Sequence, residues 1–167
     1  GPPVIADVAR LPRLLRLVAP LAWRTRAAIA RKLMGFSHTE HGSALDMFRA
    51  AELTDDPRLR RLFYRHGLDE ARHAQRFREA AKAVGGPEVS AGHYGRIHAV
   101  RQDLYERLGL VRFVAFVWLS ESRAKAQFEA LSDHFAAADV DGLGDMLHHL
   151  FEEVGAEWGT DEPDFAS

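Results

Sequence analysis

The sequence predicts an all-α protein, an antiparallel four-helix bundle with an additional amphipathic helix at its N-terminus. Apolar residues recur at three- and four-residue steps in four segments, and nowhere do they alternate with polar residues as in strands. The 167 residues, 47% hydrophobic and 28% charged, match the size and composition of one soluble globular domain. We therefore expect an N-terminal basic amphipathic segment, residues 1–36, and a helical bundle, residues 37–160.

The composition excludes several classes of protein. The formal net charge is −2, so no basic excess attracts nucleic-acid phosphates, and we expect no nucleic-acid partner. The absence of cysteine excludes disulfides, thiolate metal sites and a cysteine nucleophile, which leaves oxygen and nitrogen atoms as metal ligands. Neither a signal peptide nor an apolar run of membrane-spanning length is evident, which indicates a cytoplasmic protein.

The N-terminal segment alternates basic and apolar residues over residues 4–36. Its basic residues are Arg10, Arg13, Arg16, Arg24, Arg26, Arg31 and Lys32. One interpretation is a helix that lies across the bundle with its arginines in water. The other is a helix that binds a membrane surface or a partner protein. Pro12 and Pro20 are expected to break this helix into pieces.

Two helices are expected in the first half of the bundle. The first continues or restarts at about residue 37 and runs to residue 53, with Ser37 available as an N-cap ahead of Glu40. The second covers residues 57–84, because an Asp-Pro pair precedes it and two glycines follow it.

The second half of the bundle follows a loop and is more apolar. A break is expected near Gly109, and the apolar run over residues 113–119 should be deeply buried because it is apolar nearly all round. A turn separates the last two helices. The expected helices cover residues 96–108, 110–135 and 143–158.

The stretch Asp69-Glu70-Ala71-Arg72-His73 lies inside the helix over residues 57–84. Glu70 and His73 share one helix face about a turn apart, where a carboxylate oxygen and an imidazole nitrogen can converge on one metal ion. That face also carries the apolar stripe, so both side chains are predicted to point inward. A carboxylate there is costly unless it is paired or bound to metal. The alternative is a solvated pair on the helix surface.

The same pattern of carboxylates recurs in the two halves of the chain. Glu70 follows Glu40 by 30 residues, and Glu153 follows Glu121 by 32. Four inward glutamates from four helices would repel one another unless two divalent cations neutralised them. An internal repeat of helix, carboxylate, turn, helix and carboxylate therefore predicts a two-metal site.

Some of these positions have rival interpretations. Glu40 could be a first-turn charge favoured by the helix dipole. Glu129 competes with Glu121. Glu152 and Glu157 compete with Glu153, while His148 and His149 are interpreted as surface groups or as groups that support a ligand.

This pattern resembles the ferritin-like di-metal carboxylate superfamily, which includes rubrerythrins, bacterioferritins and ubiquinone-precursor hydroxylases. Its members carry one glutamate on each of two helices and Glu-x-x-His on each of the other two. The matching residues are Glu40, Glu70, His73, Glu121 and Glu153. Ala156 stands where the family has its second histidine, and alanine cannot ligate a metal. His149 and Glu157 are the nearest substitutes.

The resemblance implies a di-iron oxidoreductase, with manganese as the other metal that such ligands suit. One ion would be held by Glu40, Glu70 and His73, and the other by Glu121 and Glu153. The centre would activate dioxygen or peroxide to oxidise or hydroxylate a small organic substrate, with electrons from a donor protein or from the substrate. The N-terminal segment suggests a hydrophobic substrate at a membrane surface, or an interface such as that of a homodimer.

Two other functions remain open at this point. One is an iron-binding, ferroxidase or storage protein without an organic substrate, although the N-terminal segment is no part of a simple ferritin subunit. The other is a helical scaffold whose metal site has decayed, for which Ala156 is the only direct sign.

Overall fold

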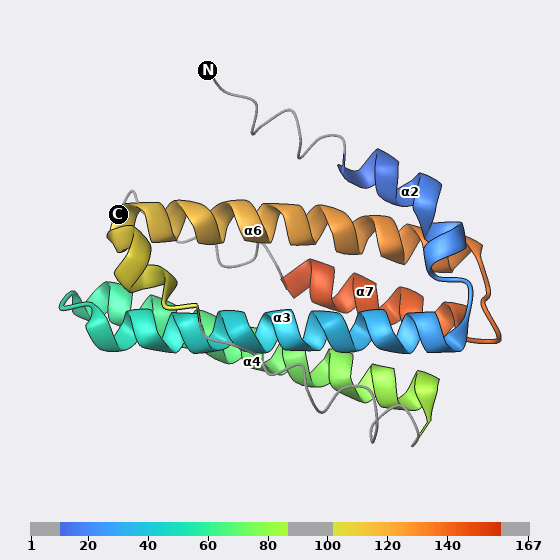
Figure 1. Cartoon of the computed structure of the whole chain (residues 1–167), viewed down its shortest axis with the longest axis horizontal. Coiled ribbons are helices and arrows are strands. Elements are labelled where there is room, and N and C mark those ends of the chain that lie inside the picture. The colour runs from blue at the N-terminus through green and yellow to red at the C-terminus, as the bar shows by residue number, and fades with distance from the viewer. Residues whose placement is uncertain (1–10, 87–101, 158–167) are drawn as a thin grey trace. The chain divides into compact units, whose positions relative to one another are not determined.

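A computed structural model describes residues 11–86 and 102–157, which form helices joined by turns, with no strand among them (Figure 1). The all-α prediction is therefore confirmed for this part of the chain. The helices are α2 (Leu11–Ala22), α3 (Arg26–Leu53), α4 (Pro57–Gly85), α6 (Leu104–Ala137) and α7 (Gly144–Glu157). The chain divides into two compact units: a central unit, Ile29–Val114, and a terminal unit, Gly1–Ala28 with Ala115–Ser167.

Helices α3 and α4 form an antiparallel hairpin in the central unit and lie side by side (Figure 1). The turn between them ends at Asp56, whose carboxylate accepts hydrogen bonds from the amides of Arg58 at 2.7 Å and Leu59 at 3.2 Å. Pro57 follows at the first helical position, where its missing amide proton costs nothing. The predicted start of α4 and its predicted end at the glycine pair are both confirmed.

Helix α3 begins at Arg26, so it continues through residue 37 and does not restart there, and Ser37 is no N-cap. Thr25 takes that role, because its hydroxyl accepts a 3.2 Å hydrogen bond from the amide of Ala28. The hydroxyl of Ser37 instead donates a buried hydrogen bond to Ala74 of α4.

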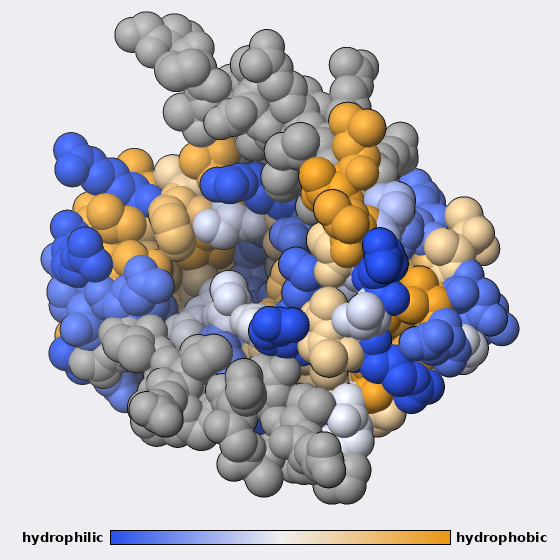
Figure 2. Space-filling view, turned by 45° about the vertical axis from the view of Figure 1, so that its right-hand side comes forward, coloured by the Kyte–Doolittle hydropathy of each residue, from blue (hydrophilic) through white to orange (hydrophobic). Residues whose placement is uncertain are grey.

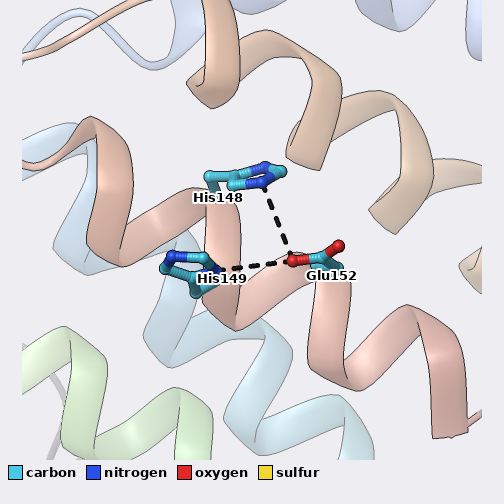
Figure 3. Close-up of side chains that lie close together, drawn as sticks. All are labelled: His148, His149 and Glu152. Carbon is cyan, nitrogen blue, oxygen red and sulfur yellow. Dashed lines mark hydrogen bonds and ion pairs between the residues drawn. The ribbon is translucent and has the colours of Figure 1, made fainter.

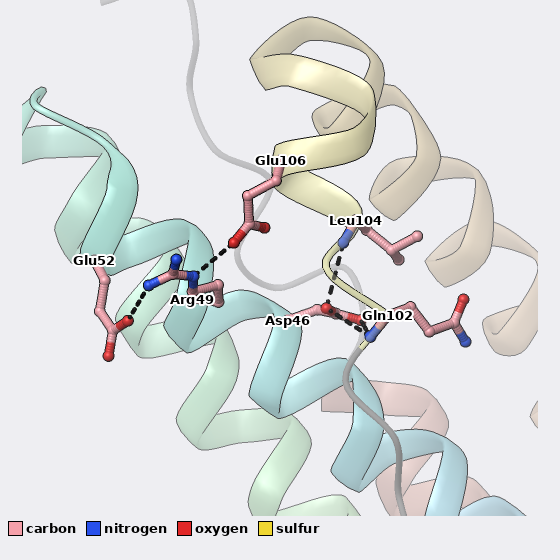
Figure 4. Close-up of polar contacts among 6 residues, drawn as sticks. All are labelled: Asp46, Arg49, Glu52, Gln102, Leu104 and Glu106. Atoms are coloured by element: carbon pink, nitrogen blue, oxygen red, sulfur yellow. Dashed lines mark hydrogen bonds and ion pairs between the residues drawn. The ribbon is translucent and has the colours of Figure 1, made fainter.

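Helix α6 begins at Leu104, and residues 96–101 of the helix expected over residues 96–108 lie outside the described residues. Asp46 of α3 explains this start, because its carboxylate accepts hydrogen bonds from the amides of Gln102 at 3.1 Å and Leu104 at 3.4 Å (Figure 4). The predicted break at Gly109 is confirmed: its φ of 72° lies in the left-handed region that favours glycine.

Salt bridges add to the contact between α3 and the first turn of α6. The guanidinium of Arg49 donates to Glu106 at 2.6 Å and to Glu52 at 3.0 Å (Figure 4). These groups are partly or largely exposed, so water screens each pair and its contribution to stability is small. The buried carboxylate of Asp46 is the stronger determinant of where α6 starts, because it caps backbone amides that lack a helical acceptor.

An aromatic cluster forms the core of the terminal unit. The ring of Trp23, directly after α2, lies edge-on to Phe135 of α6 and Phe151 of α7, at centroid distances of 5.6 and 5.8 Å. Phe128 also contacts Phe151. The predicted turn before α7 is confirmed, and the carboxylate of Asp139 accepts a 2.9 Å hydrogen bond from the amide of Gly144 there.

Over residues 11–36 the basic amphipathic segment is broken into two helices, as predicted, but the break follows Ala22 and lies at neither Pro12 nor Pro20. Pro12 is the second residue of the helix, where an amide has no helical acceptor. Pro20 lies in the last turn, where losing one backbone hydrogen bond is tolerable, and the chain leaves the helix only after Ala22. Leu17 and Leu21 are 78% and 74% exposed, so α2 presents apolar side chains to solvent.

The apolar run over residues 113–119 is not deeply buried, which corrects a second expectation. Phe113 is buried, but Phe116 and Trp118 are 44% and 62% exposed. A helix that packs on one side buries a single stripe, whatever the hydropathy of its other residues. Figure 2 shows hydrophobic side chains at the surface between hydrophilic ones. Among the described residues, no helix combines the length and apolarity that a membrane crossing requires.

Candidate metal centre

The α3–α4 hairpin brings together three of the five predicted ligands, Glu40, Glu70 and His73. Their side chains are buried, with exposures of 4%, 3% and 1%. One ligand atom from each lies within 4.8 Å of the others. The prediction that Glu70 and His73 face inward is confirmed, and the solvated-pair alternative is wrong.

The helix stripes explain why these polar side chains are buried. On α4, Glu70 and His73 continue the buried series of Phe63 and Gly67 at steps of three and four residues. On α3, Glu40 lies between buried residues a turn before and a turn after it. Glu40 is well inside a helix that begins at Arg26, so the first-turn interpretation of its charge is wrong.

Hydrogen bonds and nearby charge determine the state of the Glu70 carboxylate. Burial raises its pKa, but hydrogen bonds from the Glu40 carboxyl and from His66, with the charges of His66 and His73, outweigh burial and lower it. Glu70 is therefore ionised, with the Glu40 carboxyl group and His66 as its hydrogen-bond partners. The Nδ1 atom of His73 lies 3.9 Å from Oε2 of Glu40.

His66 is a member of the site that sequence reasoning did not select. Its Nε2 lies 3.2 Å from Oε1 of Glu70, one turn along α4, and its side chain is 29% exposed. The four-residue spacing between His66 and Glu70 is the signal that could have identified it. His66 thus links the buried carboxylate to the surface of the protein.

This donor set fits a metal ion. Two carboxylates and an imidazole are hard and borderline ligands, which suit iron, manganese or zinc at a site without sulfur. A cation would offset the cost of burying both carboxyl groups, Glu40 and Glu70. Glu40, Glu70 and His73 would hold such an ion, and His66 lies near enough to support it.

The other two predicted ligands belong to the terminal unit. Glu121 on α6 is half-buried. Glu153 on α7 is exposed, so the prediction that it points inward is wrong. The reason is the register of α7, whose buried stripe runs through Leu147, Phe151 and Val154 and leaves position 153 outside it.

The rival and substitute residues for the second ion are exposed as well. Ala156 faces solvent, so the position of the family's second histidine is not directed into the core. The exposed rivals and substitutes are Glu129, His149, Glu152 and Glu157. The second half of the predicted repeat therefore lacks the buried carboxylate that the first half has at Glu70.

No protein-family model matches this chain, and neither a curated protein nor a solved structure matches it. The case for a metal centre therefore rests on the buried cluster itself. Its strongest element is the ionised carboxylate of Glu70, which is buried between Glu40, His66 and His73.

Proposed function

We propose that this chain binds an iron or manganese ion at Glu40, Glu70 and His73 and is an oxidoreductase that activates dioxygen or peroxide. The observation that carries the proposal is the burial of two carboxylates and an imidazole within 4.8 Å of one another. The resemblance to ferritin-like carboxylate proteins supports the choice of metal, and the four-helix bundle it implies is part of the proposal. The substrate is a small organic molecule.

Bound iron would supply the redox chemistry, and the chain's own residues would prepare the site for it. The ionised Glu70 provides negative charge that favours a cation. His66, partly exposed and in contact with Glu70, can carry protons between the site and solvent. The buried ring of Phe77, one turn after His73, helps to exclude water.

A single-ion centre agrees best with the geometry. The resemblance implies a second ion at Glu121 and Glu153, but Glu153 is exposed and Ala156 contributes no ligand.

The exposed leucines of α2, Leu17 and Leu21, are consistent with a hydrophobic substrate or partner at a membrane surface. Electrons come from a donor protein or from the substrate, since the chain has no cysteine-ligated redox centre.

A second candidate is a ferroxidase, for which ferrous iron itself is the substrate. The partial exposure of His66 favours it, because a partly exposed imidazole beside the buried carboxylate lies where an incoming ion would first meet a ligand. Ferrous iron added under air separates the two functions. A ferroxidase consumes dioxygen in proportion to the iron supplied, whereas an organic oxidase needs only the bound iron and consumes dioxygen with its substrate.

Metal content measured by elemental analysis tests the proposal. Glu70→Ala should lower bound iron at least tenfold, because it removes a ligand and a buried charge, while circular dichroism shows the helices retained. Glu79→Ala is the matched control, since Glu79 is an exposed glutamate on the same helix. Full iron occupancy in Glu70→Ala would overturn the proposal.

A further inference from the structure

A second cluster of metal-ligating side chains lies on α7, away from the buried stripe of that helix. It consists of His148, His149 and Glu152, one ligand atom of each lying within 4.8 Å of the others (Figure 3). The Oε2 atom of Glu152 is 3.7 Å from Nε2 of His148 and 3.4 Å from Nδ1 of His149. Neither the buried cluster nor the function proposed for it uses these residues.

The hydrogen bonds of His148 determine which of its nitrogens is free. Its Nδ1 lies 3.1 Å from the backbone carbonyl oxygen of Ser132, which can only accept, so Nδ1 carries a proton. The Ser132 hydroxyl is 2.9 Å from the same nitrogen. In the neutral ring Nε2 therefore presents a lone pair, and it points toward the Glu152 carboxylate.

This arrangement of His148 is the one that metal-ligating histidines adopt. Such a histidine donates its other ring N–H to a carbonyl or carboxylate, which fixes the tautomer and the orientation of the ring. A neutral Nε2 facing a carboxylate oxygen places two lone pairs opposite each other, which is unfavourable unless a cation lies between them. The side chain of His148 is 29% exposed, so an ion from solvent can reach it.

The separations of both imidazoles from Glu152 match the size of a transition-metal ion. Two ligands bound at about 2.1 Å in a tetrahedral site are about 3.4 Å apart. The observed separations from Glu152, 3.4 and 3.7 Å, are close to this value without any movement of the helix. Residues at steps of three and four share one helix face, so α7 itself provides the geometry.

We propose that His148, His149 and Glu152 form a surface site for a divalent transition-metal ion of the zinc, copper or nickel type. Two imidazoles and one carboxylate are the ligand set that such ions prefer over magnesium or calcium. Three protein ligands leave a tetrahedral ion with one open position, which water or a small anion can fill. The site is distinct from the buried cluster, so its test does not depend on the function proposed above.

Zinc titration of the intact chain by calorimetry tests this site, in a Glu70→Ala background that disables the buried cluster. His149→Ala and Glu152→Gln should each weaken zinc binding about tenfold or more, because each removes one of three ligands. Both side chains are well exposed, at 67% and 59%, so folding should be unaffected. His41→Ala and Glu129→Gln, which remove an imidazole and a carboxylate outside the cluster, should leave the affinity unchanged.

Copper(II) bound to the same chain provides a second readout. Its electron paramagnetic resonance spectrum should show coupling to imidazole nitrogens that is reduced in His149→Ala and retained in His41→Ala. The competing explanation is a simple ion pair between a protonated imidazole and Glu152. Zinc affinity unchanged in both His149→Ala and Glu152→Gln, or no zinc binding in the Glu70→Ala background, would establish that explanation and overturn the proposal.

Discussion

The hydroxyl of Ser37 donates a buried hydrogen bond of 2.7 Å to the backbone carbonyl oxygen of Ala74, which joins α3 to α4. Ser37 lies one turn before Glu40, and Ala74 follows His73 directly in the sequence. The bond therefore holds the two helices in register at the point where their ligands meet.

Ser37→Ala should lower the free energy of unfolding by about 1 kcal/mol, because a buried hydrogen bond between helices is lost. It should also weaken iron binding, because Glu40 and His73 lose part of their alignment. Urea unfolding and iron titration measure the two effects. Thr39→Ala is the control, since the Thr39 hydroxyl donates within its own helix, to Gly35 at 3.1 Å on the exposed side. Equal effects of both substitutions would contradict this role.

Gly67→Ala should destabilise the protein by about 1–3 kcal/mol through overpacking. A Cβ atom at Gly67 would lie 2.7 Å from the ring of Phe48 and 3.2 Å from Cβ of Met47, so the Phe48 ring would have to shift or α4 would have to move away from α3. Gly35→Ala is the matched control, because a Cβ there meets nothing within 4 Å. It should stabilise the protein by up to about 1 kcal/mol through helix propensity. Thermal and urea unfolding of both variants measure whether Gly67→Ala lowers the stability while Gly35→Ala raises it.

The ionisation of Glu70 should make the stability of the metal-free protein depend on pH. The folded-state pKa of Glu70 is lowered from its ordinary value of 4.5, so folding is favoured by its ionised form above that pH. This contribution is lost as the pH falls below 4.5 and through the folded-state pKa. The difference in unfolding free energy between the native chain and Glu70→Gln should therefore shrink on acidification, as urea titrations at several pH values would show.

The matched control for this pH dependence is Glu79→Gln, at an exposed position of the same helix. The difference in unfolding free energy between Glu79→Gln and the native chain should stay nearly constant over the same range of pH. If the difference in unfolding free energy between Glu70→Gln and the native chain also stays constant, or grows on acidification, the carboxylate of Glu70 is not ionised in the folded protein.

Ala156→His should leave the iron content per chain unchanged. Residue 156 and Glu153 are both exposed on α7, so an imidazole introduced there points to solvent and completes no buried site. Elemental analysis after iron loading measures the content, and loading Glu70→Ala in parallel gives the value for a disabled buried cluster. A second iron bound to Ala156→His would show that the two-ion centre implied by the ferritin-like resemblance forms in solution.

The sequence by itself determined the features that depend on local spacing. The periodicity of α4 placed Glu70 and His73 on the buried face, because residues three and four apart share one side of any helix. The Asp-Pro pair located the start of α4, and Gly109 located the break in α6, because each acts on its own backbone. The strongest half of the candidate site was therefore predictable.

Only the tertiary structure decided which helix faces are covered by neighbouring elements and which face solvent. Glu153 and Trp118 lie on periodic helices too, but the neighbouring elements cover other faces of α7 and α6, and both side chains are exposed. Asp46 starts α6 from another helix, across more than fifty residues of sequence, and no local pattern reports such a contact. Helical spacing states which residues lie together, while burial depends on what packs against them.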